Sequence, residues 1–127
     1  MEKKRILVVE DSPAILEMVK DQLTEAGYEV IPATNGFEAL RDLLDIRPDL
    51  IITDIMMPKV NGLELCQAMK NRLETRSIPF ILFSSMFDDD TLKQGRAVGA
   101  KFFIAKPFEM KTLLDCVAKI FSEGKAP

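Results

Sequence analysis

Short runs of apolar residues alternate along the chain with longer segments in which apolar residues recur every three or four positions. Apolar runs of about 4–8 residues are typical of strands buried on both faces, as in a parallel sheet. Their positions predict five strands, at about residues 5–9, 28–33, 49–53, 79–83 and 101–105. The segments between them have the period of amphipathic helices. They predict five helices, at about residues 13–26, 36–46, 61–72, 88–99 and 109–121.

Residues that favour helix ends support these boundaries. Ser12-Pro13 supplies an N-cap followed by proline at the first helical position, and Gly27 suits the position just after a helix. Two asparagines have a glutamate three residues later, the spacing of a capping box; the pairs are Asn35 with Glu38 and Asn61 with Glu64. The third helix is expected to bury Leu63, Cys66, Leu73 and either Met69 or the aliphatic part of Lys70.

The order of elements predicts the topology. Five strands that alternate with helices indicate an α/β fold, and connections of this length between parallel strands are right-handed. Pro32 lies in the second strand, where it cannot donate to a ladder, so that strand belongs at an edge. The pattern favours a flavodoxin-like, doubly wound (βα)5 domain with strand order 2-1-3-4-5. In such sheets, ligands bind beyond the carboxyl ends of strands 1 and 3.

Length and composition bound the class of protein. The 127 residues are expected to form a single domain, with a core at about 4–121 and residues 122–127 as a tail or the start of a linker. The apolar runs are too short for a transmembrane helix or a signal peptide, so we expect a cytoplasmic protein without a membrane partner. A net charge of −3 and a pI of about 5.0 argue against direct nucleic-acid binding.

Missing residue types exclude several kinds of active site. The chain contains no histidine, which excludes Ser-His-Asp and Cys-His catalytic groups and any histidine-bearing zinc site. It also has no glycine-rich nucleotide loop of either common kind. Cys66 and Cys116 fall in predicted helices, and we expect two buried, reduced thiols.

Polar residues follow four of the predicted strands at the point where each apolar run stops. They are Glu10-Asp11, Asp54, Ser84 and Lys106-Pro107. Because the carboxyl ends of parallel strands meet at one edge of the sheet, three carboxylates, a hydroxyl and an ammonium are expected to converge there.

This set of side chains suits phosphoryl chemistry assisted by a divalent cation. Mutual repulsion among Glu10, Asp11 and Asp54 favours a hard cation such as Mg2+, with Mn2+ as a second possibility and the backbone carbonyl of Met56 as a further ligand. Asp54 is central and is the best candidate nucleophile, since carboxylates form aspartyl phosphates. Lys106 can neutralise a phosphoryl oxygen as a point charge. The hydroxyl of Ser84 can donate to another such oxygen.

Each residue alone also has a plain structural interpretation. Asp11 can cap a helix, Ser84 can satisfy a turn, and a Lys-Pro pair commonly marks a turn. The acidic run Asp88–Asp90 is interpreted as charge favoured at a helix N-terminus and not as a metal site. The combination of all four strand ends favours the functional interpretation.

With these motifs in view, the chain resembles the receiver domain of two-component response regulators over about residues 4–121. The matching segments are Ile6-Leu-Val-Val-Glu-Asp11, Asp54-Ile-Met-Met-Pro58 with Gly62, Ile81-Leu-Phe-Ser84-Ser85 and Gly99-Ala-Lys-Phe-Phe-Ile-Ala-Lys-Pro107. The set is specific, whereas each segment alone is weak.

The resemblance implies a phosphoacceptor signalling switch and not a metabolic enzyme, with self-phosphorylation and self-dephosphorylation as its only chemistry. Asp54 would receive phosphate from a histidine kinase or a histidine phosphotransfer protein. Output would pass through the face of the fourth helix, fifth strand and fifth helix to a protein partner or to an output domain absent from this chain. The implied roles are metal binding for Glu10 and Asp11, the switch hydroxyl for Ser84, the switch aromatic for Phe103 and phosphoryl binding for Lys106.

Departures from the usual pattern and alternative functions stay open. Ser84 stands where threonine is commoner, Ser85 where alanine or glycine is usual, and Phe103 where tyrosine is common. A phosphorylation-independent pseudo-receiver would keep the fold without using the site. A haloacid-dehalogenase-type phosphatase would need an aspartate where Met56 stands, and Glu10-Asp11 would repel the phosphate of a flavodoxin cofactor.

Overall fold

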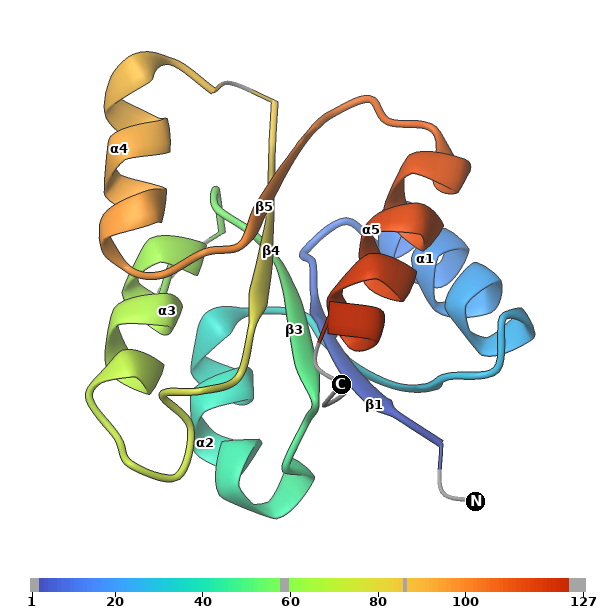
Figure 1. The fold of residues 1–127 in the computed structure, drawn as a ribbon, viewed down its shortest axis with the longest axis horizontal. Helices are drawn as coiled ribbons and strands as arrows, with labels where there is room; N and C mark the ends of the chain where they lie inside the picture. The colour runs from blue at the N-terminus through green and yellow to red at the C-terminus, as the bar shows by residue number, and fades with distance from the viewer. Residues whose placement is uncertain (1–2, 58–59, 86, 124–127) are drawn as a thin grey trace.

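A computed structural model describes residues 3–57, 60–85 and 87–123 of the chain. A five-stranded parallel sheet forms its centre, in the order β2-β1-β3-β4-β5 (Figure 1). The strands are β1 (Arg5–Val9), β2 (Glu29–Ala33), β3 (Leu50–Asp54), β4 (Phe80–Ser84) and β5 (Phe102–Ala105). The flavodoxin-like class and the predicted strand order are therefore confirmed. β3 and β4 each end one residue later than predicted, so Asp54 and Ser84 are the last residues of their strands.

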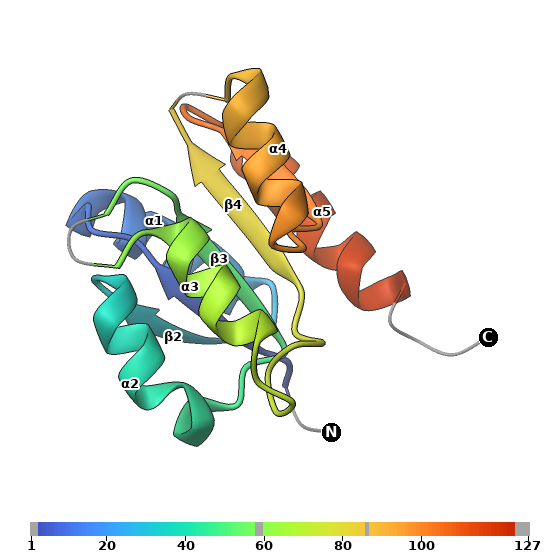
Figure 2. The ribbon, with the colours of Figure 1, turned by 90° about the vertical axis from the view of Figure 1, so that its left-hand side faces the viewer.

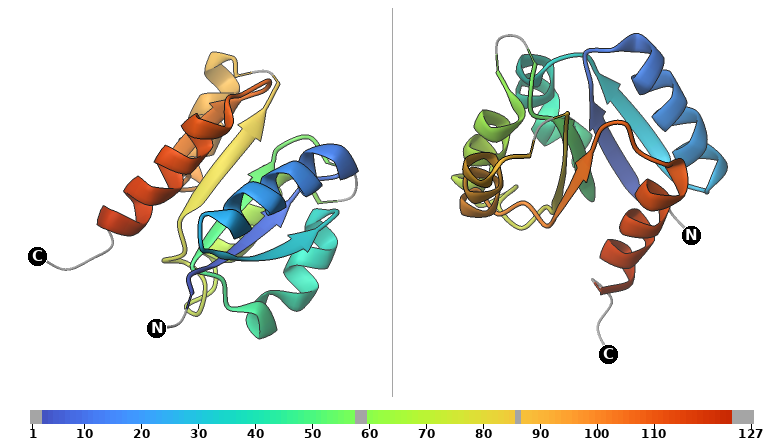
Figure 3. Two further views of the ribbon diagram at one scale, coloured as in Figure 1. Left: turned by 90° about the vertical axis from the view of Figure 1, so that its right-hand side faces the viewer. Right: turned by 90° about the horizontal axis from the view of Figure 1, so that it is seen from above.

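Helices cover both faces of the sheet. They are α1 (Pro13–Glu25), α2 (Gly36–Ile46), α3 (Gly62–Lys70), α4 (Asp89–Ala97) and α5 (Met110–Glu123). Figure 2 shows α2, α3 and α4 on one face, and Figure 3 shows α1 and α5 on the other. Within the described residues, no helix combines the length and the apolarity needed to cross a bilayer.

Strand side chains alternate between two hydrophobic cores, which explains why the strands are apolar throughout. Ile6, Val8 and Phe83 belong to the core beneath α1 and α5. Leu7 and Leu82 belong to the core beneath α2 and α3. β1, β3 and β4 are almost entirely buried, whereas β2 is partly exposed. The exposed Pro32 lies on this edge strand, opposite Val8, as predicted.

The predicted caps are largely present. Ser12 Oγ accepts from the Ile15 N–H at 3.4 Å, and Gly27 has a φ of 103° just after α1. Asn61 and Glu64 form the complete capping box. The box predicted for Asn35 and Glu38 is only half correct. Asn35 caps α2, but the carboxylate of Glu38 accepts from the N–H and hydroxyl of Thr34 instead of from the Asn35 N–H.

The end of α3 differs most from the prediction. The helix stops at Lys70, and Leu73 in the following turn is 74% exposed, so its predicted burial is wrong. Thr75 is buried there instead, and its hydroxyl donates to the carbonyl of Met69 at 2.6 Å. This bond satisfies a carbonyl at the helix end, which a helix continuing through Leu73 would otherwise have paired. Cys66 and Met69 are buried as expected, whereas Cys116 is only half-buried.

Candidate functional site

The predicted site residues meet at the carboxyl edge of the sheet. In the ladder between β1 and β3, Val9 pairs with Thr53, so the next residue of each chain segment, Glu10 and Asp54, follows side by side. β1 leads to α1 on one face and β3 leads to α3 on the other, which opens the sheet edge at this point (Figure 1). The fold therefore places these two carboxylates at the topological switch point.

Three carboxylates form a compact cluster at this edge. One oxygen from each of Glu10, Asp11 and Asp54 lies within 4.8 Å of the other two. Glu10 is 1% exposed and Asp54 is 6% exposed, whereas Asp11 lies in solvent. The cluster is therefore a mostly buried acidic ledge that opens to solvent on the side of Asp11.

Lys106 bridges the two buried carboxylates. Its Nζ lies 2.6 Å from Glu10 Oε1 and 2.8 Å from Asp54 Oδ2. Its backbone N–H donates to the Ser84 carbonyl at 2.8 Å, which fixes the start of the segment after β5 beside the end of β4. The Lys106 ammonium therefore reaches Asp54 from the segment that follows β5.

Backbone donors hold the remaining oxygens of the same two carboxylates. The Ser12 N–H donates to Glu10 Oε2 at 3.0 Å, and the Met56 N–H donates to Asp54 Oδ1 at 3.3 Å. Met56, two residues after Asp54, is 71% exposed. Both carboxylate orientations are thus fixed by the backbone that follows their own strands.

The charge on this cluster is unbalanced. Three carboxylates and one ammonium leave two formal negative charges. Burial raises the pKa of Glu10, and repulsion by Asp54 adds to the effect. Burial alone lowers the pKa of Lys106, but its hydrogen bonds with Asp54 and Glu10 outweigh burial, and the pKa is raised. An oxygen-rich donor set with two excess negative charges fits a small divalent cation such as Mg2+.

Ser84 and Phe103 lie close to this edge on neighbouring strands. Asp54 pairs with Phe83, so Ser84 lies one residue further along β4, where it is buried. Phe103 pairs with Leu82, and its half-buried ring packs edge-on against Phe87 with ring centroids 5.6 Å apart. Ser84 is thus beside the acidic ledge, and the Phe103 ring lies against the α4 side of the sheet.

Gly62 belongs to a segment that carries the family resemblance, but the sequence assigned it no physical role. A Cβ there would lie 2.4 Å from the Asp54 carbonyl oxygen, so no other residue fits without moving the backbone of the ledge. The Gly62 N–H donates to the Ile55 carbonyl at 3.0 Å, which joins the start of α3 to the end of β3. Its only local signal is glycine at the first position of a helix, directly after the N-cap Asn61.

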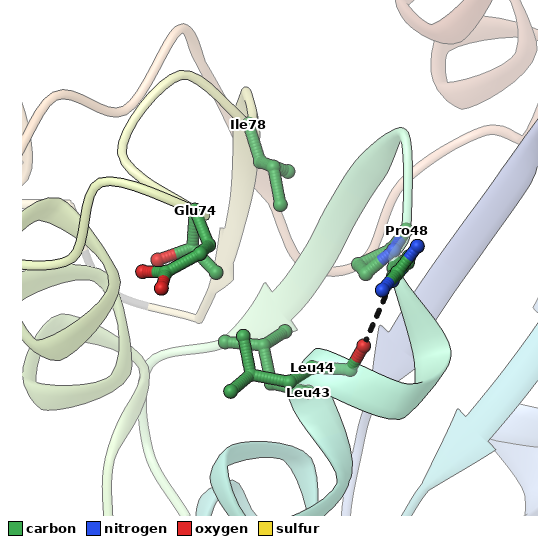
Figure 4. Close-up of a pocket in the computed structure, with 7 residues that line it drawn as sticks. Leu43, Leu44, Pro48, Glu74 and Ile78 are labelled. Atoms are coloured by element: carbon green, nitrogen blue, oxygen red, sulfur yellow. Dashed lines mark hydrogen bonds between the residues drawn. The ribbon is translucent and has the colours of Figure 1, made fainter.

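A separate hollow of about 520 Å³ lies at the opposite edge of the sheet (Figure 4). Pro48 and Ile78 come just before β3 and β4, so this edge is the amino edge. In the hollow, Arg47 Nε donates to the Leu44 carbonyl at 3.3 Å. Its lining is Leu43, Leu44, Arg47, Pro48, Glu74, Thr75 and Ile78, which includes no residue of the acidic ledge.

Comparison with known proteins identifies the family. The model of the family described as response regulator receiver domain matches residues 6–118. The DNA-binding dual master transcriptional regulator RpaA of Synechocystis is 34% identical over 110 residues, which cover 87% of this chain and 46% of RpaA. Protein PilG of Pseudomonas aeruginosa is 35% identical over 116 residues, covering 89% of this chain and 84% of PilG.

Solved structures agree with this result. Chemotaxis protein CheY4 of Vibrio cholerae superposes with a TM-score of 0.89 at 34% identity, covering 94% of this chain and 99% of CheY4. The chain thus spans about half the length of RpaA and most of PilG and CheY4. The family match, the shared fold and the acidic ledge at the switch point agree, and the chain belongs to the response regulator receiver domains, the signalling switches of two-component systems.

Proposed function

We propose that this domain is a phosphoacceptor switch in which Asp54 receives a phosphoryl group. The donor is a phosphohistidine of a histidine kinase or of a phosphotransfer protein. The observation that carries the proposal is the position of Asp54 between the ammonium of Lys106, at 2.8 Å, and two further carboxylates within 4.8 Å. Removing an ion pair from solvent costs desolvation free energy. A buried, charged carboxylate is therefore better explained by a reactive role than by a contribution to stability.

In the proposed step, one carboxylate oxygen of Asp54 bonds to phosphorus as the phosphorus–nitrogen bond of the phosphohistidine breaks. The electron pair of that bond goes to the departing imidazole nitrogen. Lys106 remains within reach of the transferred group and neutralises one phosphoryl oxygen. The backbone N–H of Met56 restrains the other Asp54 oxygen and so orients the carboxylate.

Glu10, Asp11 and Asp54 are proposed to hold Mg2+, or Mn2+ in its place, with the backbone carbonyl of Met56 as a further ligand. When bound, the cation neutralises phosphoryl oxygens during transfer. The donor set supports this assignment, since the two excess negative charges of the ledge match a divalent ion. Glu10 is held rigidly by Lys106 and the Ser12 N–H, whereas Asp11 is exposed and free to adjust to the ion.

Phosphorylation is proposed to reach the surface through Ser84 and Phe103. A phosphoryl group adds about 1.5–2 negative charges at Asp54, which attracts the Ser84 hydroxyl. Movement of Ser84 makes room for the Phe103 ring, and the face formed by α4, β5 and α5 changes shape. The register supports this coupling, because Phe103 lies two residues before Ala105, the partner of Ser84. If activation shifted the Phe103 resonances in Ser84→Ala as much as in wild type, this coupling would be excluded.

The domain boundaries, the location and the output of the protein are also part of this proposal. The receiver domain is proposed to run from about residue 4 through the end of α5; Ser122 and Glu123, predicted to lie in a tail or linker, belong to that helix, and residues 124–127 lie outside the described residues. The domain acts in the cytoplasm and does not contact nucleic acid directly. Output passes to a protein partner or to an output domain. RpaA is described as a DNA-binding regulator, and the matched region covers 46% of its length.

Intact-mass analysis tests the central claim. The protein is incubated with Mg2+ and acetyl phosphate, and we expect a single phosphate adduct that is absent in Asp54→Asn. Asp45→Asn, which removes an exposed carboxylate from α2, serves as the matched control and should keep the adduct. Omission of the divalent cation should abolish the adduct in every variant. Absence of any adduct in wild type would favour a phosphorylation-independent pseudo-receiver.

A further inference from the structure

A buried glycine lies in the middle of α4, directly against the ring of Phe103. A Cβ built on Gly95 would lie 2.4 Å from Phe103 Cε1 and 3.0 Å from its Cζ. The next atom is Leu82 Cδ1, at 3.2 Å. Real Cβ atoms do not approach other carbons this closely, so the ring occupies the space that any other residue at position 95 would fill.

Local helix preference does not explain this glycine. Glycine in a helix interior is unfavourable relative to alanine, because it loses more backbone entropy on folding. Gly95 is neither the cap nor the end of α4, which runs from Asp89 to Ala97. Its backbone is regular, in contrast to Gly27 and Gly99, which have positive φ angles. The close approach of the Phe103 ring is therefore the physical reason for a glycine here.

Two further side chains complete the surroundings of the ring. Phe87 meets it edge-on, with an interplanar angle of 84°. The guanidinium carbon of Arg96 lies 5.9 Å from the ring centroid, in cation–π range. We call this arrangement of Gly95, Phe87 and Arg96 the α4 seat. The carbonyl of Gly95 also takes part in the C-terminal cap of α4, where it accepts from the Ala100 N–H at 3.0 Å and Gly99 has a positive φ.

We propose that Gly95 is the positioning residue for Phe103, and that the α4 seat holds the ring in its resting place. The inference rests on the proposed function only where it links this ring to signalling. The seat supplies contacts that the ring must give up before it can move toward Ser84. The equilibrium between the two ring positions is then set by α4 as well as by the phosphoryl group, since a ligand shifts such an equilibrium only by its differential affinity.

Gly95→Ala tests the seat in the unphosphorylated protein. The chain has eight phenylalanines, so the Phe103 ring resonance is assigned by its loss in Phe103→Leu. We expect Gly95→Ala to shift this resonance and to remove its nuclear Overhauser contacts with Phe87. Gln94→Ala, at an exposed position of the same helix, is the matched control and should leave the Phe103 resonance in place.

Thermal unfolding gives a second, independent readout. Without the Phe103 ring, in a Phe103→Ala background, Gly95→Ala should raise Tm by about 4 °C through helix preference alone. With the ring present, the rise should be smaller or reversed. Additive effects of the two substitutions, together with an unshifted Phe103 resonance in Gly95→Ala, would overturn the proposal.

The remaining measurements separate this inference from the proposed function. Gly95→Ala should still form the phosphate adduct on Asp54, and phosphorylation should then shift the Phe103 resonance less than in wild type. Should Gly95→Ala fail to fold, Arg96→Ala opens the seat without a clash and should shift the Phe103 resonance on its own; no shift there would count against the seat. A shifted ring without any phosphate adduct supports the seat and contradicts the phosphoacceptor function.

Discussion

Lys106 and Asp54, which are 52 residues apart in the sequence, meet at 2.8 Å between Nζ and Oδ2. The lysine side chain is 15% exposed and that of Asp54 is 8% exposed, so the pair is largely removed from water. Since Glu10 lies on the same ammonium at 2.6 Å, one positive charge serves two buried carboxylates. A substitution of Lys106 should therefore affect both the stability of the domain and the chemistry of its site.

Lys106→Met is expected to lower the free energy of unfolding by about 3 kcal/mol in the absence of divalent cations, as for a buried ion pair that loses one partner. The loss arises because Glu10 and Asp54 are then buried without a counter-charge. Addition of Mg2+ should recover part of the loss, since a cation that binds only the native state stabilises it. Urea denaturation with Mg2+ and with a chelator measures both effects.

Lys111→Met provides the matched control for this prediction. Lys111 pairs with Asp115 at 3.0 Å, but the two side chains are 82% and 67% exposed. An exposed pair of this kind contributes little, so the change should stay within about 0.5 kcal/mol. Equal losses for both lysine variants would show that burial of the Lys106 pair has no energetic consequence.

The sequence predicted the site because a parallel sheet converts sequence position into spatial position. Glu10, Asp54 and Lys106 each follow an apolar strand, and parallel strands end at the same edge. The residue types alone then indicated an acidic ledge with one ammonium. What the sequence did not reveal was that Lys106 already pairs with both carboxylates without a phosphoryl group, because a lysine's partner depends on side-chain conformation in the folded chain.

The errors came from local contacts that periodicity does not encode. The helical period continued to Leu73, but the hydrogen bond of Thr75 to the Met69 carbonyl ends α3 earlier and leaves Leu73 in solvent. Glu38 had the right spacing for a capping box, but the neighbouring Thr34 offered two donors. The sequence carried no expectation for Gly95, because only the position of a distant aromatic ring explains a glycine there.

Thr75→Val should therefore destabilise the domain although it preserves the shape of the side chain. Valine keeps a second branch in place of the hydroxyl but leaves the Met69 carbonyl without its 2.6 Å partner. We expect the free energy of unfolding to fall by about 1 kcal/mol, because the Met69 carbonyl keeps the Arg72 N–H at 3.2 Å but loses its shorter hydrogen bond. Thr75→Ser retains the hydroxyl and should lose less in urea denaturation. A larger loss for serine than for valine would assign the role of Thr75 to packing.

Asp88 predicts a specific dependence of stability on pH. Its carboxylate accepts from the Thr91 N–H at 2.8 Å as the N-cap of α4, and this bond lowers its pKa from the ordinary 3.8. A lowered pKa in the folded state means that the contribution is complete above the unfolded pKa. It is lost as the pH falls through the folded value.

Asp88→Asn should flatten this dependence, since asparagine also caps helices but does not titrate there. Wild type should lose more of its Tm than the variant between about pH 5 and about pH 3. Asp88→Ala, which removes the cap at every pH, should lower Tm at neutral pH as well. The same change of Tm with pH in wild type and Asp88→Asn would contradict the assignment. Circular dichroism melts of wild type and both variants across this pH range measure these differences in Tm.

The two cysteines should differ in reactivity because they differ in burial. Cys66 is fully buried in α3, and burial raises the pKa of its thiol far above the usual value. Cys116 is half-buried on α5, where burial and the nearby Asp115 also raise its pKa, to a smaller extent.

Since the thiolate is the reactive form, native protein treated with iodoacetamide should gain one adduct, at Cys116, and faster at higher pH. Urea should expose the second site, and Cys116→Ser should gain no adduct while folded. Native labelling of Cys66 at a rate equal to that of Cys116 would show that α3 opens far more often than its packing implies.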